Sequence, residues 1–460
     1  MTDIRDTANG DDTAGDIAAG DVAAAEAAVP APGADVLGGA SLPAVRRRVQ
    51  WALVVSQILG GLGVSTAVAL AAVLAQDIGG SEAVAGLAST SSVIGTALLS
   101  LPFAALMARR GRRVGLTSAY AVAAVGGLVV VVAATVRNFP LLLVGMAAFG
   151  AGNVAGLQAR FAAADLAEPL KRARAISVVV WATTIGAVLG PNIAAPAGSS
   201  VAPLGVPRTA GPFLWGTAVF VVAGLLLQLL LRPDPLLTAR ALSRAERAGT
   251  GGGGADADRA DEADERSLRA GLSAVAASPR ARAALAAVAG SHTVMVSVMV
   301  MTPVDLGSHG AGLELIGLVI SGHITGMYAF SPVMGWLADR IGRVSVILVG
   351  VALLACATAL AGTANGHHAQ SAAGLFVLGL GWSAGLVAGS ALLTDAVPQQ
   401  SRAAVQGLSD MIMNAAAGVG GALSGLVVAQ AGYGWLNLLA AALLVPVAAL
   451  ALPVVTRRRT

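Results

Sequence analysis

Two pairs of side chains with soft donor atoms lie four residues apart in neighbouring apolar runs of the sequence. Met295 and Met299 form one pair, and His323 and Met327 form the other. Residues four apart lie on one face of an α-helix, so each pair projects from one side if both runs are helical. Thioether and imidazole groups suit soft or borderline metals, Cu(I) above all. The spacing indicates a path of metal ligands for copper, as transported cargo and not as a resident cofactor.

The two pairs are predicted to lie at matching depths in adjacent antiparallel helices. At about 1.5 Å per residue, Met295 and His323 each lie roughly 14 Å from the outer end of their helices. A site of thioethers and imidazole carries no fixed charge, so it could bind a monovalent cation and still release it. Methionine at helical spacing is also an ordinary filler of an apolar core, and the residues alone leave both interpretations open.

The elements that hold these pairs are predicted to be membrane-spanning helices. The chain has 460 residues, of which 56% are hydrophobic and 12% are charged, whereas soluble proteins carry about 25% charged residues. Composition therefore excludes a soluble protein. The net charge of +4 does not indicate a nucleic-acid partner, because the basic residues have a membrane explanation. The single cysteine, Cys356, excludes a disulfide framework.

Twelve apolar runs, each long enough to span a bilayer, follow one another along the chain. They are predicted at 51–76, 83–108, 114–136, 139–164, 175–197, 212–231, 283–304, 313–338, 344–363, 371–394, 403–428 and 433–455. The expected organisation is a disordered tail (1–44), a six-helix bundle (45–231), a polar linker (232–282), a second six-helix bundle (283–456) and a basic tail (457–460). The predicted fold class is an all-α membrane protein with twelve transmembrane helices in two bundles.

Arginine placement predicts the orientation of the chain in the membrane. With both termini in the cytoplasm, nearly every Lys and Arg at a helix end lies inside, and only Arg137 and Arg208 lie outside. We therefore expect a multi-pass protein of a bacterial plasma membrane, with the lipid bilayer and a small-molecule or metal-ion cargo as its partners. We expect the chain to work as a monomer.

The two halves repeat at a constant offset of 230 residues. Pro102 meets Pro332 at this offset, and the same shift pairs Arg110 with Arg340, Arg113 with Arg343, Asp165 with Asp395, and Arg172 with Arg402. Such repeats are typical of secondary transporters, which bind their cargo near the midplane between the halves. We interpret Asp165, Asp395, Arg172 and Arg402, which lie in symmetry-related turns, as residues of gate salt bridges.

The turn after the eighth span reads GWLADRIGR and resembles the G-x-x-x-D-x-x-G-R loop of the major facilitator superfamily. The matching residues are Gly335, Asp339, Gly342 and Arg343, with Arg340 after the aspartate. The resemblance implies a fold of two six-helix bundles, transport by alternating access, and an aspartate that locks the cytoplasmic side. The first-half loop reads LMARRGRR. At the 230-residue offset, Arg109 replaces the aspartate and Arg112 replaces the second glycine.

The fifth span contains Gly186, Gly190 and Pro191, which resemble the G-x-x-x-G-P core of a motif in drug–proton antiporters. The other interpretation of these residues is a helix kink with close packing. In the fourth span, Met146 and Phe149 stand where antiporters have arginine and glutamine. These departures from the antiporter motifs weaken the case for proton-driven drug efflux as the function.

Two ionisable side chains, Arg160 and Asp410, enter the spans. Charges inside a membrane are costly, so they usually pair or take part in transport. We expect Asp410 to have a structural partner near the cytoplasmic gate, with a proton carrier as the alternative. We expect Arg160 to reach the cytoplasmic interface.

M-x-x-x-M on the seventh span and H-x-x-x-M on the eighth are similar to the paired signature of the CcoA-like copper importers. That branch of the superfamily implies copper uptake through Met295, Met299, His323 and Met327. The sequence therefore predicts a secondary transporter, and no enzyme, that imports copper. The alternative is a transporter, most simply an exporter, of a small organic solute or drug. A third class is a transporter fold kept as a sensor or assembly partner. No phosphate-binding loop for ATP is visible.

Overall fold

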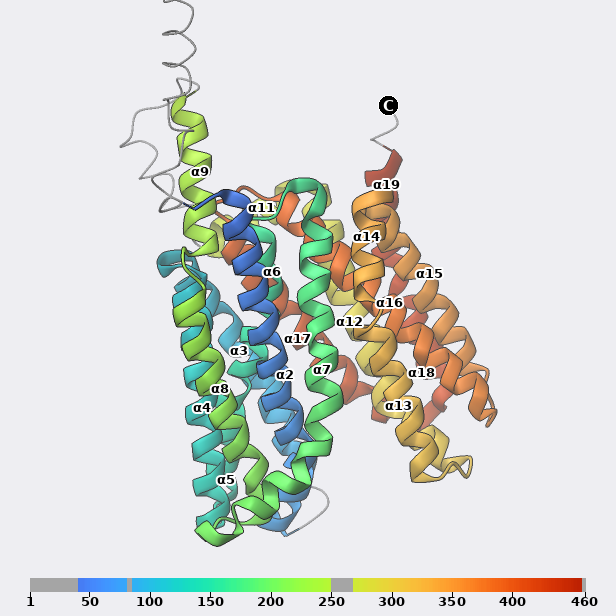
Figure 1. The fold of residues 1–460 in the computed structure, drawn as a ribbon. Coiled ribbons are helices and arrows are strands. Elements are labelled where there is room, and N and C mark those ends of the chain that lie inside the picture. Colours follow the sequence, from blue (N-terminus) through green and yellow to red (C-terminus); the bar gives the residue numbers. More distant parts are fainter. Residues whose placement is uncertain (1–39, 81–84, 250–267, 457–460) are drawn as a thin grey trace, which may run out of the picture.

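The computed structural model describes residues 40–80, 85–249 and 268–456, which form an almost entirely helical protein (Figure 1). Twelve of its helical segments are long and apolar enough to cross a membrane. The predicted all-helical fold with twelve spans is therefore confirmed. Most of the predicted N-terminal tail, the middle of the linker and the basic C-terminal tail lie outside the described residues.

The first six spans form the N-bundle. They are α2 (Leu42–Gly79), α3 (Ala85–Arg110), α4 (Arg112–Val136), α5 (Phe139–Phe149) continued by α6 (Ala151–Asp165), α7 (Arg172–Ser200) and α8 (Gly211–Leu230). Three short 3₁₀ turns connect them: η3 (Pro169–Lys171), η4 (Ala202–Leu204) and η5 (Arg208–Ala210). Local chemistry sets several ends, since Asn138 caps α5 by accepting a hydrogen bond from the Leu141 amide at 2.9 Å.

The last six spans form the C-bundle. They are α12 (Pro279–Ser308), α13 (Leu313–Tyr328) continued by α14 (Ser331–Ile341), α15 (Arg343–Gly362), α16 (His368–Ala396), α17 (Arg402–Ala431), and α18 (Tyr433–Ala442) continued by α19 (Leu444–Thr456). Ser278 caps α12 through the Ala281 amide, and Pro279 takes a first-turn position where no amide hydrogen is needed.

Two helices of the linker, α9 (Pro235–Gly249) and α11 (Leu268–Ala277), mark one end of the molecule, called the linker end below (Figure 1). The opposite end is called the far end. Arg240 on α9 donates to the Ala108 carbonyl of the N-bundle and to the Gln400 carbonyl of the C-bundle. The first linker helix therefore contacts both bundles.

Small residues allow the helices of each bundle to approach closely, as is usual in lipid. A Cβ on Gly95 would lie 2.0 Å from the Ala147 carbonyl oxygen, and one on Gly126 would lie 2.4 Å from the Phe149 amide nitrogen. Phe149, Phe213 and Phe220 then fill the N-bundle with aromatic rings whose centroids lie 5.1–5.5 Å apart. Tight backbone contact and large buried rings together fix the helices in place.

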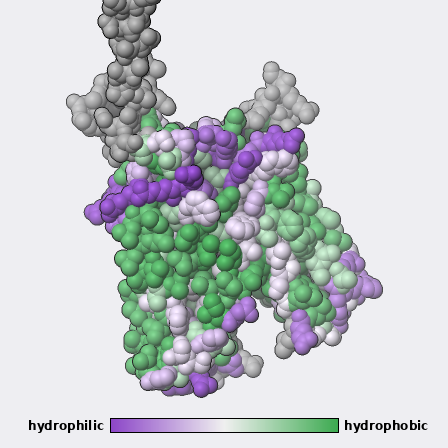
Figure 2. Space-filling view, viewed as in Figure 1, coloured by the Kyte–Doolittle hydropathy of each residue, from purple (hydrophilic) through white to green (hydrophobic). Residues whose placement is uncertain are grey.

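The bundles meet at the linker end and are hollowed apart at the far end. The apolar core of the C-bundle continues into Phe161 of α6 and Ile176 of α7, which belong to the linker-end half of the N-bundle. In this half α3 packs on α17 and α7 packs on α14. At the other end a hollow separates the two halves (Figure 2). The path between the bundles is thus closed towards the linker and open towards the far end.

Candidate functional site

A cavity of about 360 Å³ lies between the two bundles. Its lining comes from α2, α3, α6 and α7 of the N-bundle and from α12, α13, α16 and α17 of the C-bundle. Four helices of each half therefore surround it, as expected of a cargo site between transporter repeats. A volume of this size lies in the usual range of small-molecule sites, about 300–1,000 Å³.

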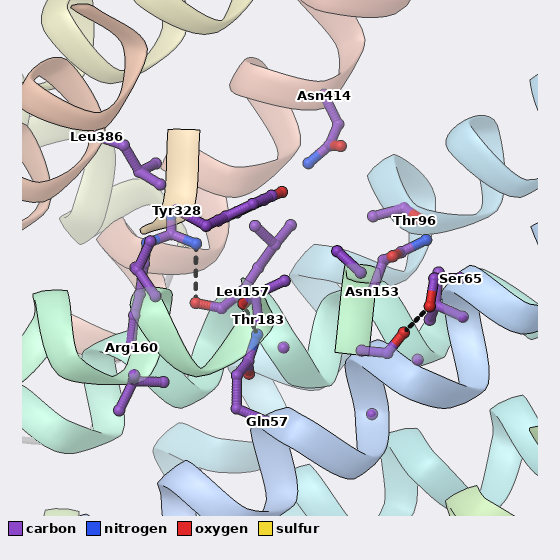
Figure 3. A pocket seen from close by; sticks show the side chains of 18 of the residues that line it. Gln57, Ser65, Thr96, Asn153, Leu157, Arg160, Thr183, Tyr328, Leu386 and Asn414 are labelled. Atoms are coloured by element: carbon purple, nitrogen blue, oxygen red, sulfur yellow. Dashed lines mark hydrogen bonds between the residues drawn. The ribbon is translucent and has the colours of Figure 1, made fainter. Parts of the chain in front are cut away.

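The N-bundle gives the cavity a wall of amides and hydroxyls. Gln57 on α2 donates from Nε2 to the Thr183 hydroxyl on α7 at 2.8 Å, and its carbonyl oxygen Oε1 is buried without a hydrogen-bonding partner. Ser65 donates to the Gly186 carbonyl at 2.7 Å, and Asn153 projects from α6 (Figure 3). This wall can accept and donate hydrogen bonds without adding charge.

The C-bundle contributes an aromatic wall. Trp382 of α16 donates from its indole nitrogen to Nδ1 of His292 on α12 at 2.8 Å, which leaves Nε2 of a neutral imidazole as a donor. Tyr328 of α13 meets the Trp382 ring edge to face, with centroids 5.4 Å apart. Tyr328 and Asn414 enter the cavity from the side opposite Gln57 (Figure 3). Planar solutes can stack on such a wall.

Arg160 of α6 and Asp410 of α17 form a buried ion pair beside the cavity. Nη2 of Arg160 lies 2.5 Å from Oδ1 of Asp410, and the two side chains are 2% and 0% exposed. Gln158 donates to the other oxygen of Asp410 at 2.7 Å, and Arg160 also reaches the Ser390 hydroxyl at 3.1 Å. Asp410 thus has the expected structural partner, whereas the expectation that Arg160 reaches the interface is wrong. A direct carboxylate partner keeps it inside.

The ion pair belongs to a longer buried network that ends at Arg112. The Arg112 guanidinium donates to Asp165 at 2.8 Å and to Gln158 at 2.8 Å within the N-bundle, and to Gln406 of the C-bundle. The network runs from Arg160, which lines the cavity, to Arg112 and Asp165, which lie where α4 begins and α6 ends at the linker end. Buried charges need such complete pairing to be tolerated, so opening this end must break several charged hydrogen bonds.

Closer to the linker, the loop predicted to form a lock holds the N-terminus of α7. The Asp339 carboxylate accepts hydrogen bonds from the amides of Ala173 at 3.2 Å and Arg174 at 2.9 Å. An anion at the positive end of a helix is favourable, typically by about 0.3–1 kcal/mol. Asp395 lies 2.5 Å from Arg172 of the N-bundle and 2.5 Å from Arg343 of its own bundle. These residues join the bundles across the closed end.

Other residues named for the gate lie nearby but do not all bridge the bundles. Asp165 pairs with Arg112 inside the N-bundle. Arg402 donates to the side chain of Gln399, and the described residues give it no carboxylate within salt-bridge distance. Arg340 stacks over the Trp336 ring at 5.1 Å.

The structure corrects the alignment of the two symmetry-related loops by one residue. Gly111 precedes α4 with φ 90° and Gly342 precedes α15 with φ 98°, a conformation that L side chains rarely adopt. The equivalent of Gly342 is therefore Gly111, and the equivalent of Arg343 is Arg112. The offset of 230 residues paired Gly342 with Arg112, whereas the matching glycine is Gly111, one position earlier. The ion pairs Arg112–Asp165 and Arg343–Asp395 become counterparts in the two halves.

The residues named for a helix kink pack against α2. The α7 helix continues through Gly186, Gly190 and Pro191. A Cβ on Gly186 would lie 2.5 Å from the Leu62 amide nitrogen, and one on Gly190 would lie 1.9 Å from the Ser65 hydroxyl oxygen. Both glycines therefore allow α2 and α7 to touch beside the cavity.

The four Met and His residues of the predicted metal path lie in the C-bundle, outside the cavity lining. Met295 and Met327 are buried in the C-bundle core, and Met299 packs against it. His323 is wholly buried, with Nδ1 2.7 Å from the Leu375 carbonyl of α16 and Nε2 without a partner. Because α13 packs mainly on α16 and only marginally on α12, the seventh and eighth spans do not form the close pair that the path assumes.

The cavity itself was missed by reasoning from the sequence. Its polar residues, such as Gln57 and Asn153, have no motif and stand singly in apolar helices. One available signal was the presence of amides inside predicted spans, because uncharged polar groups in a membrane also require partners. The aromatic residues Tyr328 and Trp382 gave a second signal, since only 4% of the chain is aromatic.

Comparison with known proteins decides the family. The profile of the Major Facilitator Superfamily matches residues 53–309 and 283–460. The chain belongs to this superfamily of transporters. A Bacillus subtilis (strain 168) protein described as an uncharacterised MFS-type transporter, YddS, is 36% identical over 399 residues, which cover 86% of this chain and 88% of that protein.

Two further members of the superfamily extend the comparison. The riboflavin transporter RfnT of Brucella anthropi is 26% identical over 86% of this chain and 92% of its own length. Among solved structures, the transporter FucP in its outward conformation superposes with a TM-score of 0.65 at 15% identity, over 87% of this chain and 97% of that one. This structural likeness concerns the fold. These similarities establish the superfamily and do not single out its copper-importing branch.

Proposed function

We propose that this superfamily member transports a small, uncharged organic solute through the central cavity. The observation that carries the proposal is Gln57, a residue of the cavity lining whose buried carbonyl oxygen has no hydrogen-bonding partner. A buried acceptor without a partner costs about 1–3 kcal/mol, and a solute that donates a hydrogen bond would offset this. The one charged lining residue, Arg160, is neutralised by Asp410, so the site favours uncharged cargo.

The class of cargo that fits is a planar heteroaromatic compound with hydrogen-bonding edges. Such a solute would stack on Tyr328 and Trp382 and donate to Gln57, while Nε2 of His292 would donate to one of its acceptors. Riboflavin has this chemistry, and the similarity to a riboflavin transporter makes it the first compound to test.

The arrangement supports transport by alternating access in a bacterial plasma membrane. The linker end carries the Arg-rich turns, so we place it in the cytoplasm with both termini. The open far end then faces outwards, and the described conformation is ready to receive cargo from outside. Because one chain supplies both walls of the cavity, we propose a monomer as the transporting unit.

The test is binding and transport by the purified full-length protein. We expect riboflavin to bind in detergent and to cross the membrane of proteoliposomes, with Gln57→Ala weakening binding roughly tenfold, the effect of losing a buried hydrogen bond of about 1.4 kcal/mol. Gln228→Ala on α8, outside the cavity lining, is the matched control. If neither riboflavin nor other planar heteroaromatic compounds bind, or if both substitutions act alike, the proposal fails.

Copper import is the second candidate, and His323 is the observation in its favour. Its Nδ1 bonds to a backbone carbonyl and its Nε2 is left free, an arrangement usual for metal-binding histidines. A copper path would run through the C-bundle core past Met295 and Met327, and not through the central cavity.

Cellular copper content distinguishes the two candidates. If the methionines are ligands, Met295→Leu and Met299→Leu should cut copper accumulation at unchanged protein level, although such swaps usually cost less than about 1.5 kcal/mol of stability. Met334→Leu, near the linker end of the same bundle, is the control. Normal copper uptake by the Met295→Leu/His323→Ala variant would remove this candidate and leave the organic solute.

A further inference from the structure

A second cavity, of about 300 Å³, lies on the N-bundle at the linker end, away from the path between the bundles. The first turns of α2, the end of α6 and the start of α7 surround it. We call it the basic pocket. Its lining residues are Arg46, Arg47, Val49, Gln50, Ala163, Leu166, Ala167, Glu168, Lys171, Arg174, Ala175 and Val178.

The charges of the basic pocket do not cancel. Its lining contains one carboxylate, Glu168, and four cations, which are Arg46, Arg47, Lys171 and Arg174. Glu168 lies 3.1 Å from Arg46 and 2.7 Å from Lys171, and the hydrogen bond from Lys171 lowers the pKa of Glu168. This one anion is therefore shared by two cations. In the described part of the chain, the exposed side chains of Arg47 and Arg174 have no carboxylate within salt-bridge distance, and the Asp339 carboxylate interacts with Arg174 at longer range.

The helix that begins here, α7, carries cations in its first turn, and its terminal amides already donate to the Asp339 carboxylate of α14. The first turn of α7 contains Arg172 and Arg174 and no acidic residue, although helix N-termini favour anions and disfavour cations. Arginines at the end of a span help to set membrane orientation, but that role requires neither a cavity nor their convergence on one. Convergence of four cations on a cavity whose lining holds one carboxylate favours an anionic ligand.

The apolar walls of the basic pocket indicate what kind of anion would bind. Val49, Leu166 and Val178 form an apolar surface next to the guanidinium groups, and the linker end borders the broad hydrophobic band of the protein (Figure 2). A free anion would use the cations alone. A phosphate joined to acyl chains would use both the cations and the apolar wall.

We propose that the basic pocket binds the head group of an anionic phospholipid. Basic pockets between transmembrane helices on the cytoplasmic side favour such head groups, and each nearby basic residue contributes about 1 kcal/mol. All lining residues belong to the N-bundle, so the lipid would stay bound while the two bundles move relative to each other. Asp339 contacts the Arg174 backbone from the C-bundle, which places the lipid beside the gate without making it part of the gate.

Native mass spectrometry of the delipidated full-length protein in detergent tests this proposal. We expect phosphatidylglycerol to be retained in preference to phosphatidylcholine with the same acyl chains. The Arg47→Gln/Arg174→Gln variant should weaken that retention by about 10- to 30-fold, as expected for two basic contacts. Arg109→Gln/Arg110→Gln is the control, because these arginines are exposed at the same end but lie outside the pocket.

Three results would overturn the proposal. The first is equal retention of the two lipids by the unchanged protein, and the second is an equal loss in the pocket and control variants. The third is displacement of phosphatidylglycerol by millimolar inorganic phosphate, which would assign the site to a free anion. Lys171→Gln provides an independent variant whose loss of retention should be smaller than that of the double variant.

Discussion

At the scale of single residues, Arg160 and Asp410 determine how costly it is to open the closed end. They come from opposite bundles, their side chains are 2% and 0% exposed, and Gln158 and Ser390 complete their hydrogen bonds. Moving the bundles apart would leave each charge alone in a low-dielectric environment, which costs several kcal/mol per ion. The pair therefore holds the linker end shut until another interaction replaces it.

We predict that removing one charge is worse than removing both. Asp410→Asn leaves Arg160 buried without its counter-ion, and breaking one partner of a buried pair typically costs about 3–5 kcal/mol. Arg160→Gln should have a similar effect, whereas the Arg160→Gln/Asp410→Asn variant should be more stable than either single variant. Thermal unfolding of the purified proteins in detergent measures this. Additive losses in the double variant would show that the two side chains do not act as a pair.

At the scale of helices, the contact between α7 and α14 closes the linker end. Gly335 allows this contact, because a Cβ there would lie 2.2 Å from the Ser177 hydroxyl oxygen and 2.7 Å from the Ala173 carbonyl oxygen. Ser331 strengthens it by donating to the Ser177 carbonyl at 3.0 Å. Gly335, the first glycine of the loop, thus allows α14 to contact α7. Asp339 caps the N-terminus of α7.

We predict that Gly335→Ala loosens the closed end. Forcing a methyl group into this contact should cost about 1–3 kcal/mol, which shifts the population towards the state open at the linker end. Spin labels at residues 110 and 340, on opposite bundles, in a Cys356→Ser background would report a longer distance. Gly322→Ala is the control on the same span, since a Cβ there meets nothing within 4 Å. Equal distance distributions in the two variants would contradict this role.

At the scale of the whole molecule, the proposed orientation in the membrane rests on the distribution of charge, and the side from which the cavity is open rests on the hollow between the bundles. Basic side chains gather at the linker end, whereas Arg137 and Arg208 mark the far end. A hollow that opens at the far end, with the ion pairs at the other end, makes the described conformation outward-facing under the proposed orientation.

We predict the topology that reporter fusions should reveal. Fusions at residues 110 and 342 should report the cytoplasm, and fusions at 79, 308 and 367 should report the outside, because cytoplasmic loops carry the excess of Lys and Arg. An enzymatic reporter active on only one side of the membrane makes this measurement. A fusion at 342 that reports the outside would invert the orientation and, with it, the side from which the cavity is open.

The sequence by itself determined the spans, their grouping into two bundles and the residues of the second-half loop. The length of each apolar run and the repeat of Pro, Asp and Arg can both be read directly from the sequence. These signals are decisive in a membrane, because each spanning helix must form its own backbone hydrogen bonds. The offset of 230 residues located both loops but misaligned the first by one residue. Only the φ angles of Gly111 and Gly342 corrected it.

Only the tertiary structure decided which side chains meet. Gln57 and Tyr328 are far apart in the sequence and have no shared motif, yet helix packing places them on opposite walls of one cavity. Packing also separates residues that spacing had paired, since His323 bonds to the Leu375 carbonyl of α16 and its helix packs mainly on α16 and only marginally on the helix of Met295. Spacing within one helix fixes a face, but the partner of that face depends on how all the helices pack together.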